Sequence, residues 1–329
     1  MIKVSVVIPV YNVQNYIERC IRSLFEQTLD SIEYIFIDDY SSDKSIDILL
    51  DVLKEYPARE RYVKLFRNEK NLGQAGTRKR GIQMANGDFV IHCDPDDWVE
   101  LDMYEILYNK AIKENADLVW CNYYKNFEDG RQVESLFFDK ETDKVQSIFN
   151  LVSEKKWGCL WSHMVKRRIA QSSLIIWPTW NLHEDLYLVV QYTNLADKLT
   201  FLDRCLYHYF YNKEGIVATK NNHDKLSDTI MSRIFAYSGI SEICLKDCRY
   251  YQSYKYCLSV LFRAKDSLFA MCKTSSEAMD CWISVPPTLT MKELLKSDLR
   301  FLTKIYNSII ILGFFPFVNR FIDIKKRLS

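Results

Sequence analysis

The sequence predicts an α/β protein with a mostly parallel sheet flanked by helices, followed by a mainly helical C-terminal region. Short apolar, β-branched segments alternate with amphipathic helical segments up to Cys121, which is typical of right-handed strand–helix–strand crossovers. After about residue 225 the alternation stops and long helical segments follow to about residue 273. A hydrophobic content of 48%, with 14% aromatic residues, is ample for a packed core and excludes wholesale disorder.

Each predicted element rests on its periodicity and on the residues at its ends. The strands are short β-branched runs, as expected for strands buried on both faces of a sheet, and the helices repeat apolar residues three or four positions apart. Pro9 ends the first strand, Ser41-Ser42-Asp43 caps the second helix, and Asn86-Gly87 turns the chain into the central strand. The predicted order is strand 3–8, helix 15–25, strand 33–37, helix 41–56, strand 62–66, helix 74–85, strand 89–93, helix 101–115 and strand 117–121.

Polar side chains follow three of these strands. Pro9-Val10-Tyr11-Asn12 follows the first, Asp38-Asp39 the second, and Asp94-Pro95-Asp96-Asp97 the central strand. Ligands of open α/β sheets bind outside the carboxyl ends of the strands, so we expect these groups along one edge. Massed carboxylates need a positive partner, and a divalent cation such as Mg²⁺ or Mn²⁺ on a diphosphate fits best. The alternative is an acidic turn that caps the next helix.

The rest of the chain is less regular. The polar segment 126–143 is predicted to be an exposed excursion. His183-Glu184-Asp185 precedes an apolar helix through Tyr192, and a helix-dipole role is the alternative to a chemical one for these acids. Residues 1–205 carry a charge of −6 (26 basic against 32 acidic residues) and residues 206–329 carry +7 (18 against 11). We therefore predict a catalytic domain over 1–205 and a helical region over 206–329 that contacts an acceptor or a membrane surface.

The cysteines and the C-terminal tail bear on location. Ten cysteines occur without a Cys-x-x-Cys pair, which indicates reduced core residues of a cytoplasmic protein rather than a zinc site. The chain enters a strand directly after Met1, without a signal segment. Residues 308–318 are apolar but fall short of the ~20 residues needed to cross a bilayer, and basic residues follow them. Two interpretations remain open for residues 308–329: peripheral contact with the inner face of the membrane, or packing on the main domain.

The ordered motifs resemble those of the family 2 glycosyltransferases of bacterial surface-polysaccharide type, which have the Rossmann-like, nucleotide-sugar-binding GT-A fold. Asp94-Pro95-Asp96 resembles the family's metal-associated Asp-x-Asp motif, and His183-Glu184-Asp185 resembles its Glu-Asp motif. The resemblance covers about the first 200 residues, and His163 stands where the family often carries Lys. The other matching stretches are Val6-Val7-Ile8-Pro9-Val10-Tyr11-Asn12, Ile37-Asp38-Asp39-Tyr40-Ser41-Ser42-Asp43, Arg67-Asn68-Glu69-Lys70-Asn71-Leu72-Gly73, Arg78-Lys79-Arg80-Gly81-Ile82 and Gly87-Asp88-Phe89-Val90.

The resemblance implies a role for each matching residue. Asp185 would be the general base, and Glu184 would support it. Asp96 would be the direct ligand of Mg²⁺ or Mn²⁺, and Asp94 would face the ribose or the metal shell. Arg78 would pair a phosphate. The base and ribose of the nucleotide would be held by Pro9, Tyr11, Asn12 and Asp39.

The implied function is inverting, metal-dependent transfer of a hexosyl or N-acetylhexosaminyl group from a nucleotide-sugar, a UDP-sugar being favoured, to a glycan or lipid-linked acceptor. The alternatives are a GDP-sugar donor and a catalytically silent sugar-nucleotide-binding scaffold of a glycan-assembly complex. A dehydrogenase would need Gly-x-Gly-x-x-Gly where Pro9-Val10-Tyr11-Asn12 stands. The balanced net charge of +1 disfavours a nucleic-acid partner.

Overall fold

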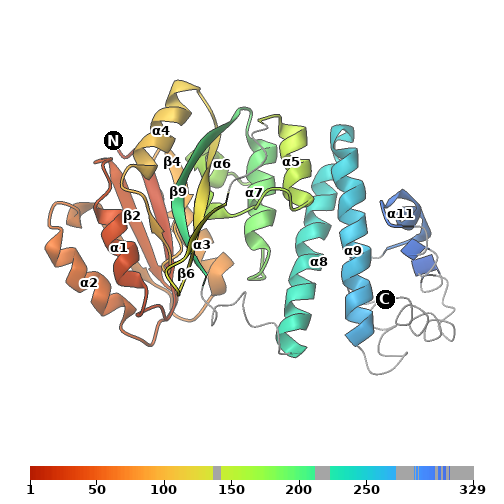
Figure 1. The fold of residues 1–329 in the computed structure, drawn as a ribbon, viewed down its shortest axis with the longest axis horizontal. Helices are drawn as coiled ribbons and strands as arrows, with labels where there is room; N and C mark the ends of the chain where they lie inside the picture. Colours follow the sequence, from red (N-terminus) through yellow and green to blue (C-terminus); the bar gives the residue numbers. More distant parts are fainter. Residues whose placement is uncertain are drawn as a thin grey trace. The chain divides into compact units, whose positions relative to one another are not determined.

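The structure, a computed structural model, describes residues 1–135, 142–211, 223–271 and 289–300, with single residues at 285 and 287 and between 303 and 311. The chain forms two compact units, Met1–Thr219 and Lys220–Ser329. All the strands that the structure describes belong to the first unit, and the second is helical (Figure 1). The predicted α/β class, with a mainly helical C-terminal region, is confirmed.

One nine-stranded sheet forms the core of the N-terminal unit, in the order β3-β2-β1-β4-β8-β6-β9-β5, with β7 paired to β6. The first four strands in this order run parallel to one another, and β6 and β9 also pair in parallel. β8 runs antiparallel to both of its neighbours, β4 and β6. The strands are β1 Val4–Val10, β2 Ile32–Asp38, β3 Val63–Arg67, β4 Phe89–His92, β5 Trp98–Val99, β6 Leu118–Phe127, β7 Gln132–Ser135, β8 His163–Lys166 and β9 Leu199–Tyr211.

The central strands are apolar throughout because both of their faces are covered. Every residue of β1 and β2 is buried. Helix α3 packs directly on this part of the sheet, since a Cβ on Gly81 would lie 2.4 Å from Cγ1 of Val7. The helices of this unit are α1 Ile17–Phe25, α2 Ser45–Glu55, α3 Gly73–Gln83, α4 Met103–Lys113, α5 Lys144–Val152, α6 Arg167–Ala170 and α7 Glu184–Leu195, with short 3₁₀ turns η1 Glu60–Tyr62 and η2 Leu160–Ser162.

One predicted feature is wrong in part. The polar segment predicted as an excursion over 126–143 begins with a hairpin, because β6 continues to Phe127 and pairs with β7. The turn contains Gly130 at φ +79°, a conformation that glycine adopts without steric cost. β7 is largely exposed, which is why its polar composition resembled a loop. Residues 136–141 lie outside the described part of the chain.

The two units divide between Thr219 and Lys220, whereas the predicted domain boundary at residue 205 falls inside β9. Helices α8 His223–Leu245 and α9 Tyr251–Met271 pack against each other in the second unit. A turn, η3 Cys248–Tyr250, joins them, and α11 Met291–Lys296 begins with a capping box between Thr290 and Glu293.

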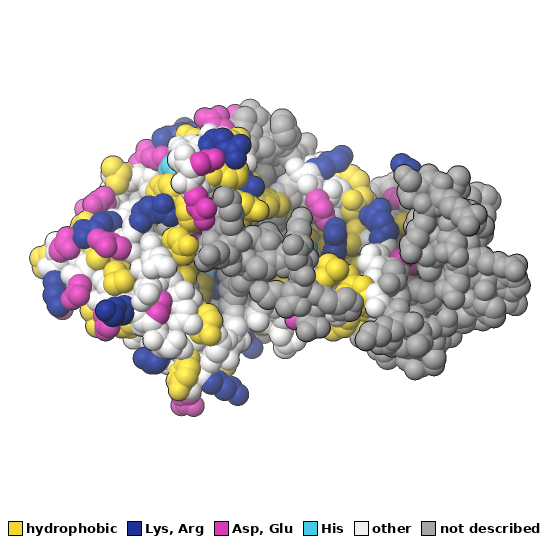
Figure 2. All heavy atoms as spheres, turned by 60° about the horizontal axis from the view of Figure 1, so that its bottom comes forward, with side chains coloured by type: hydrophobic (Ala, Val, Ile, Leu, Met, Phe, Trp, Pro, Cys, Tyr) yellow, Lys and Arg dark blue, Asp and Glu magenta, His cyan; other side chains and the backbone are white. Residues whose placement is uncertain are grey.

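None of the helices in the described ranges has the length and hydropathy needed to span a bilayer. Nearly all of the tail over 308–329 lies outside those ranges. On the face of the N-terminal unit shown in Figure 2, basic and acidic side chains are interspersed with apolar ones.

Candidate active site

One arginine brings together the carboxylates of two motifs that lie far apart in the sequence. Arg78, on α3, is fully buried. Its Nη2 donates to Oδ1 of Asp94 at 2.7 Å, just beyond the end of β4. Its Nη1 donates to Oε1 of Glu184 at 2.7 Å and to Oδ1 of Asp185, both in the first turn of α7. The C-terminal end of β4 and the N-terminal turn of α7 are thus both tied to α3 through a single guanidinium.

This arrangement bears on the expectation that Arg78 would pair a phosphate of the nucleotide. Three carboxylates engage its Nη1 and Nη2 groups, and the side chain is 1% exposed. The guanidinium is therefore positioned to hold the two acid motifs relative to each other. Asp94 and Asp185 keep side-chain exposures of 18% and 23%, so both carboxylates can still meet a ligand.

The electrostatics of this cluster favour proton uptake at the start of α7. Burial raises the pKa of Glu184 well above its usual range, and the neighbouring Asp185 adds to the shift. Burial also raises the pKa of Asp185, against the opposing charge of Arg78. Burial alone would lower the pKa of Arg78, but the charges of Asp185, Asp94 and Glu184 outweigh it and raise that pKa. A carboxylate with a raised pKa is a stronger base, so Asp185 is suited to accept a proton.

The two other acids of the loop after β4 differ sharply from each other. Asp97 is buried, and its Oδ2 and Oδ1 accept hydrogen bonds from the Tyr207 hydroxyl at 2.6 Å and from the Phe210 amide at 2.7 Å. The Tyr207 oxygen also accepts from the Asp94 amide at 3.1 Å. Asp97 therefore ties the loop to β9. The Asp96 side chain is partly exposed and receives no hydrogen bond from another described residue.

The free carboxylate of Asp96 fits a divalent cation. Burial, and then the charge of Asp94, raise the pKa of Asp96 to about 6, which a bound cation would relieve. Among the residues that the structure describes, no three Asp, Glu, His or Cys side chains gather into a complete ligand set. Asp94 and Asp96 would therefore supply two ligands, and the remaining ones would come from water and from a bound diphosphate.

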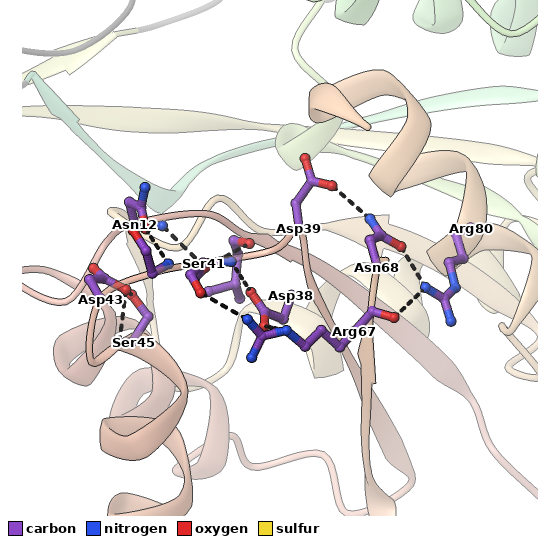
Figure 3. Close-up of polar contacts among 11 residues, drawn as sticks. Asn12, Asp38, Asp39, Ser41, Asp43, Ser45, Arg67, Asn68 and Arg80 are labelled. Atoms are coloured by element: carbon purple, nitrogen blue, oxygen red, sulfur yellow. Dashed lines mark hydrogen bonds and ion pairs between the residues drawn. The ribbon is translucent and has the colours of Figure 1, made fainter. Parts of the chain in front are cut away.

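Asp39 holds the beginning of α3, and Figure 3 shows one of its hydrogen bonds, the one from Asn68. Its Oδ1 accepts from Nδ2 of Asn68 at 2.7 Å and from the amide of Leu72 at 2.7 Å, and its Oδ2 accepts from the amide of Gly73 at 2.9 Å. A nucleotide base offers N–H donors of the same kind. Asp39 thus fixes the helix that carries Arg78, in addition to its predicted role at the nucleotide.

The remaining predicted nucleotide-binding residues lie at the end of β1. Pro9 is buried within the strand, whereas Tyr11 is 49% exposed. Asn12 adopts a left-handed conformation, φ 50°, and its Oδ1 accepts from the Ser42 amide at 2.9 Å. This bond joins the loops after β1 and β2 (Figure 3). The exposed ring of Tyr11 is the group best able to contact a planar base.

Two functional neighbours were not predicted from the sequence. Tyr207 supports Asp94 and Asp97, but it lies more than 100 positions after them in the chain. The side-chain amide of Gln74, one turn before Arg78, lies between two of these groups: with its oxygen turned toward Arg78 it accepts from Nη2 at 2.8 Å, and its nitrogen then donates to Oε1 of Glu184 at 3.2 Å. Glutamine at the start of a helix is common, so its type alone gives no signal.

Two histidines near the site have structural partners. His163 is buried, and its Nδ1 lies 2.7 Å from the carbonyl oxygen of Cys159. Burial lowers the pKa of His163 well below its usual value, so the ring is neutral. The ring of His208 stacks on Trp98, and its Nε2 lies 2.8 Å from Oε1 of Glu100.

Comparison with known proteins identifies a family model and several relatives that match this chain. Residues 5–164 match the model of the family described as glycosyl transferase family 2. Glycosyltransferase GlyA of Streptococcus pneumoniae is 31% identical over 244 residues, which are 70% of this chain and 34% of that protein. EpsH of Bacillus subtilis, a putative glycosyltransferase by name, is 33% identical over 220 residues, 65% of this chain and 62% of that protein. The chain thus spans less than two thirds of the length of these two relatives.

Solved structures share the fold over nearly the whole chain. Residues 1–349 of TarS from S. aureus, in complex with UDP-GlcNAc, superpose with a TM-score of 0.70 at 18% identity and cover 98% of this chain and 92% of that one. This likeness shows the GT-A fold. Together with the family match and the named relatives, it leads to one conclusion: residues 5–164 form a glycosyltransferase family 2 domain.

Proposed function

We propose that this protein is an inverting, cation-dependent glycosyltransferase that moves a hexosyl or N-acetylhexosaminyl group from a UDP-sugar to a glycan or lipid-linked acceptor in the synthesis of a surface polysaccharide. The observation that carries the proposal is the cluster around Arg78. It holds Asp94, beside the free carboxylate of Asp96, and Asp185, which has a raised pKa, at one edge of the sheet. A glycosyltransferase needs residues that bind the diphosphate and a separate residue that accepts the proton of the acceptor hydroxyl.

In the proposed reaction, Asp185 accepts the proton of the acceptor hydroxyl. The acceptor oxygen forms a bond to the anomeric carbon as the bond from that carbon to the diphosphate oxygen breaks, and the nucleoside diphosphate leaves with the electron pair. A single displacement inverts the anomeric centre. When bound, Mg²⁺ or Mn²⁺ supplies Lewis-acid stabilisation of the charge that grows on the diphosphate. Arg78 keeps Asp185 oriented, and Tyr11 and Asp39 bind the nucleoside.

The names of similar proteins support the choice of donor and acceptor class. A poly(ribitol-phosphate) β-glucosyltransferase of Bacillus spizizenii is 30% identical over 222 residues. TarS has been solved with UDP and with UDP-GlcNAc, whereas a mannosyltransferase of Pyrobaculum calidifontis, with a TM-score of 0.52, has been solved with GDP-Man and Mn²⁺. TarS lies nearer to this chain in sequence and fold than the mannosyltransferase does, which favours UDP over GDP, and the name of the Bacillus spizizenii enzyme favours a polyol-phosphate polymer as acceptor.

Calorimetric titration with UDP and with GDP, each with and without Mn²⁺, tests the donor site. We expect Mn²⁺-dependent binding of UDP that is lost in Asp96→Ala and kept in Asp51→Ala, because Asp51 lies exposed on α2. Tighter binding of GDP would change the donor class. Binding of neither nucleotide would contradict the proposal and favour a protein that acts as a scaffold.

The role of the base is tested separately with Asp185→Asn. This change keeps the size of the side chain and removes its basicity, so turnover should fall by at least about a hundredfold while Mn²⁺–UDP affinity stays within a few-fold of the wild type. Unchanged turnover would refute the assignment of Asp185.

A further inference from the structure

Trp157 is a large exposed ring in a segment whose backbone contacts the candidate base. Trp157 is 46% exposed, whereas Tyr123, on which its ring stacks, is 7% exposed. It lies in the segment between α5 and η2, and this segment is pressed against the start of α7. A Cβ on Gly158 would come within 2.9 Å of Cα of Leu186, and the amide of Leu160 donates to Oδ2 of Asp185 at 3.4 Å. The ring is thus attached to a stretch of backbone that touches Asp185.

The ring is also held by other aromatic side chains. It stacks on Tyr123 of β6, with centroids 5.6 Å apart and an interplanar angle of 11°, and meets Tyr209 of β9 edge to face at 5.7 Å. Tyr209 is parallel to Trp161 at 6.2 Å, and Trp161 stacks on Tyr207 at 4.2 Å. Since the hydroxyl of Tyr207 binds Asp97, a continuous set of rings runs from Trp157 to the loop after β4.

Trp157 lies over a different part of the sheet from the predicted nucleotide-binding residues. Tyr11 and Asp39 follow β1 and β2, whereas Trp157 packs over β6 and β9. In the order β3-β2-β1-β4-β8-β6-β9, the loop after β4 with Asp94 and Asp96 lies between these two groups. The donor nucleotide would therefore occupy one side of the acids, and Trp157 lies on the other side, with Asp185.

From this geometry we infer that Trp157 is a stacking platform for a pyranose ring of the acceptor. The C–H bonds on one face of a pyranose carry slight positive charge and complement the negative face of an indole, while the sugar hydroxyls stay free for Asp185. Tyr123 and Tyr209 fix the platform, so little entropy is lost when the sugar binds. The inference rests on the proposed function, because it names the acceptor side of the same site.

The test uses saturation-transfer NMR on the full chain with Mn²⁺ and UDP, with methyl glycosides of glucose, galactose and N-acetylglucosamine as probes. We expect transfer to at least one glycoside, strongest on the protons of one pyranose face. Trp157→Ala should weaken the transfer by roughly five- to tenfold, and Trp157→Phe should retain most of it. Leu50→Ala is the matched control, since Leu50 is 45% exposed on α2.

The outcomes separate this inference from the proposed function. Equal transfer in Trp157→Ala and the wild type, or no transfer to any of the glycosides in the wild type, would overturn it. Uniform transfer to both faces of the pyranose in the wild type would also overturn the inference, and this outcome does not depend on whether the variant folds. Failure to bind UDP would instead count against the proposed function, and the glycoside signal at Trp157 would still be measured.

Discussion

Replacing Arg78 by methionine should destabilise the N-terminal unit in a way that depends on pH. The change removes the only side-chain cation that the structure places within hydrogen-bond distance of Asp94, Glu184 and Asp185 among the described residues. Removing one partner of a buried ion pair costs about 3–5 kcal/mol. Here three carboxylates lose their partner, so we expect a loss of at least this size at pH 7.5.

The loss should shrink as the pH falls. Without Arg78, the pKa values of Glu184 and Asp185 rise further above those in the unfolded chain, so the folded variant binds more protons than the unfolded one. Its stability therefore increases as protons are taken up on going from pH 7.5 to 5.5. One proton gained over one pH unit contributes about 1.4 kcal/mol, so the difference from the wild type should narrow by about 1–3 kcal/mol.

Urea unfolding followed by tryptophan fluorescence measures this effect. Every tryptophan except Trp282 precedes residue 220, so the signal reports mainly on the N-terminal unit. Lys79→Met is the control, because Lys79 is exposed on the same helix and loses the same charge. A loss below about 1 kcal/mol in Arg78→Met, or the same loss at both pH values, would refute the reasoning about the buried cluster.

Two further predictions concern Asp96 and Gly73. Because the pKa of Asp96 is raised to about 6, the affinity for Mn²⁺–UDP should fall below pH 6, by up to about tenfold per pH unit, as the proton competes with the cation. Calorimetry from pH 5 to 7.5 measures this dependence. The same pH profile in Asp96→Asn would contradict the prediction. Gly73→Ala should lower stability by more than Gly130→Ala in the same urea assay. Both glycines have φ near +75° to +79°, which costs an alanine about 1–2 kcal/mol, but only at Gly73 would a Cβ meet another side chain, Asn181 Oδ1 at 2.4 Å; equal losses would argue against that contact.

Much of the fold could be predicted because local patterns carry it. The first four strands and the helices between them follow from β-branched runs and helical spacing, and the parallel direction of the strands follows from the strand–helix–strand alternation. The position of β8 could not be predicted in this way. It inserts antiparallel between β4 and β6, and the residues it pairs with in both of these strands lie more than 40 positions earlier in the chain. The turn at Gly130 was missed because β7 is exposed and therefore polar.

The candidate site shows the same division. The acids were predicted as groups because each follows a strand or opens a helix. The partners of Arg78 could not be predicted, because Asp185 lies 107 positions away and nothing local to Arg78 distinguishes it from Arg80. The contacts of Asp39 with the amides of Leu72 and Gly73 likewise depend on how α3 packs on the sheet. The predicted catalytic, nucleotide-binding and metal roles of these residues remain predictions that the experiments above test.

The position of β9 sets a lower limit on any fragment meant to fold alone. The stretch that matches the family model stops at residue 164, inside β8, yet β9 pairs with β6 along ten rungs and separates it from β5. A fragment ending there would leave β6 with an open edge, ready to pair with another copy, and Arg78 with Asp94 as its one remaining acid. Recombinant fragments of this protein should therefore extend at least through Tyr211, or they will tend to aggregate.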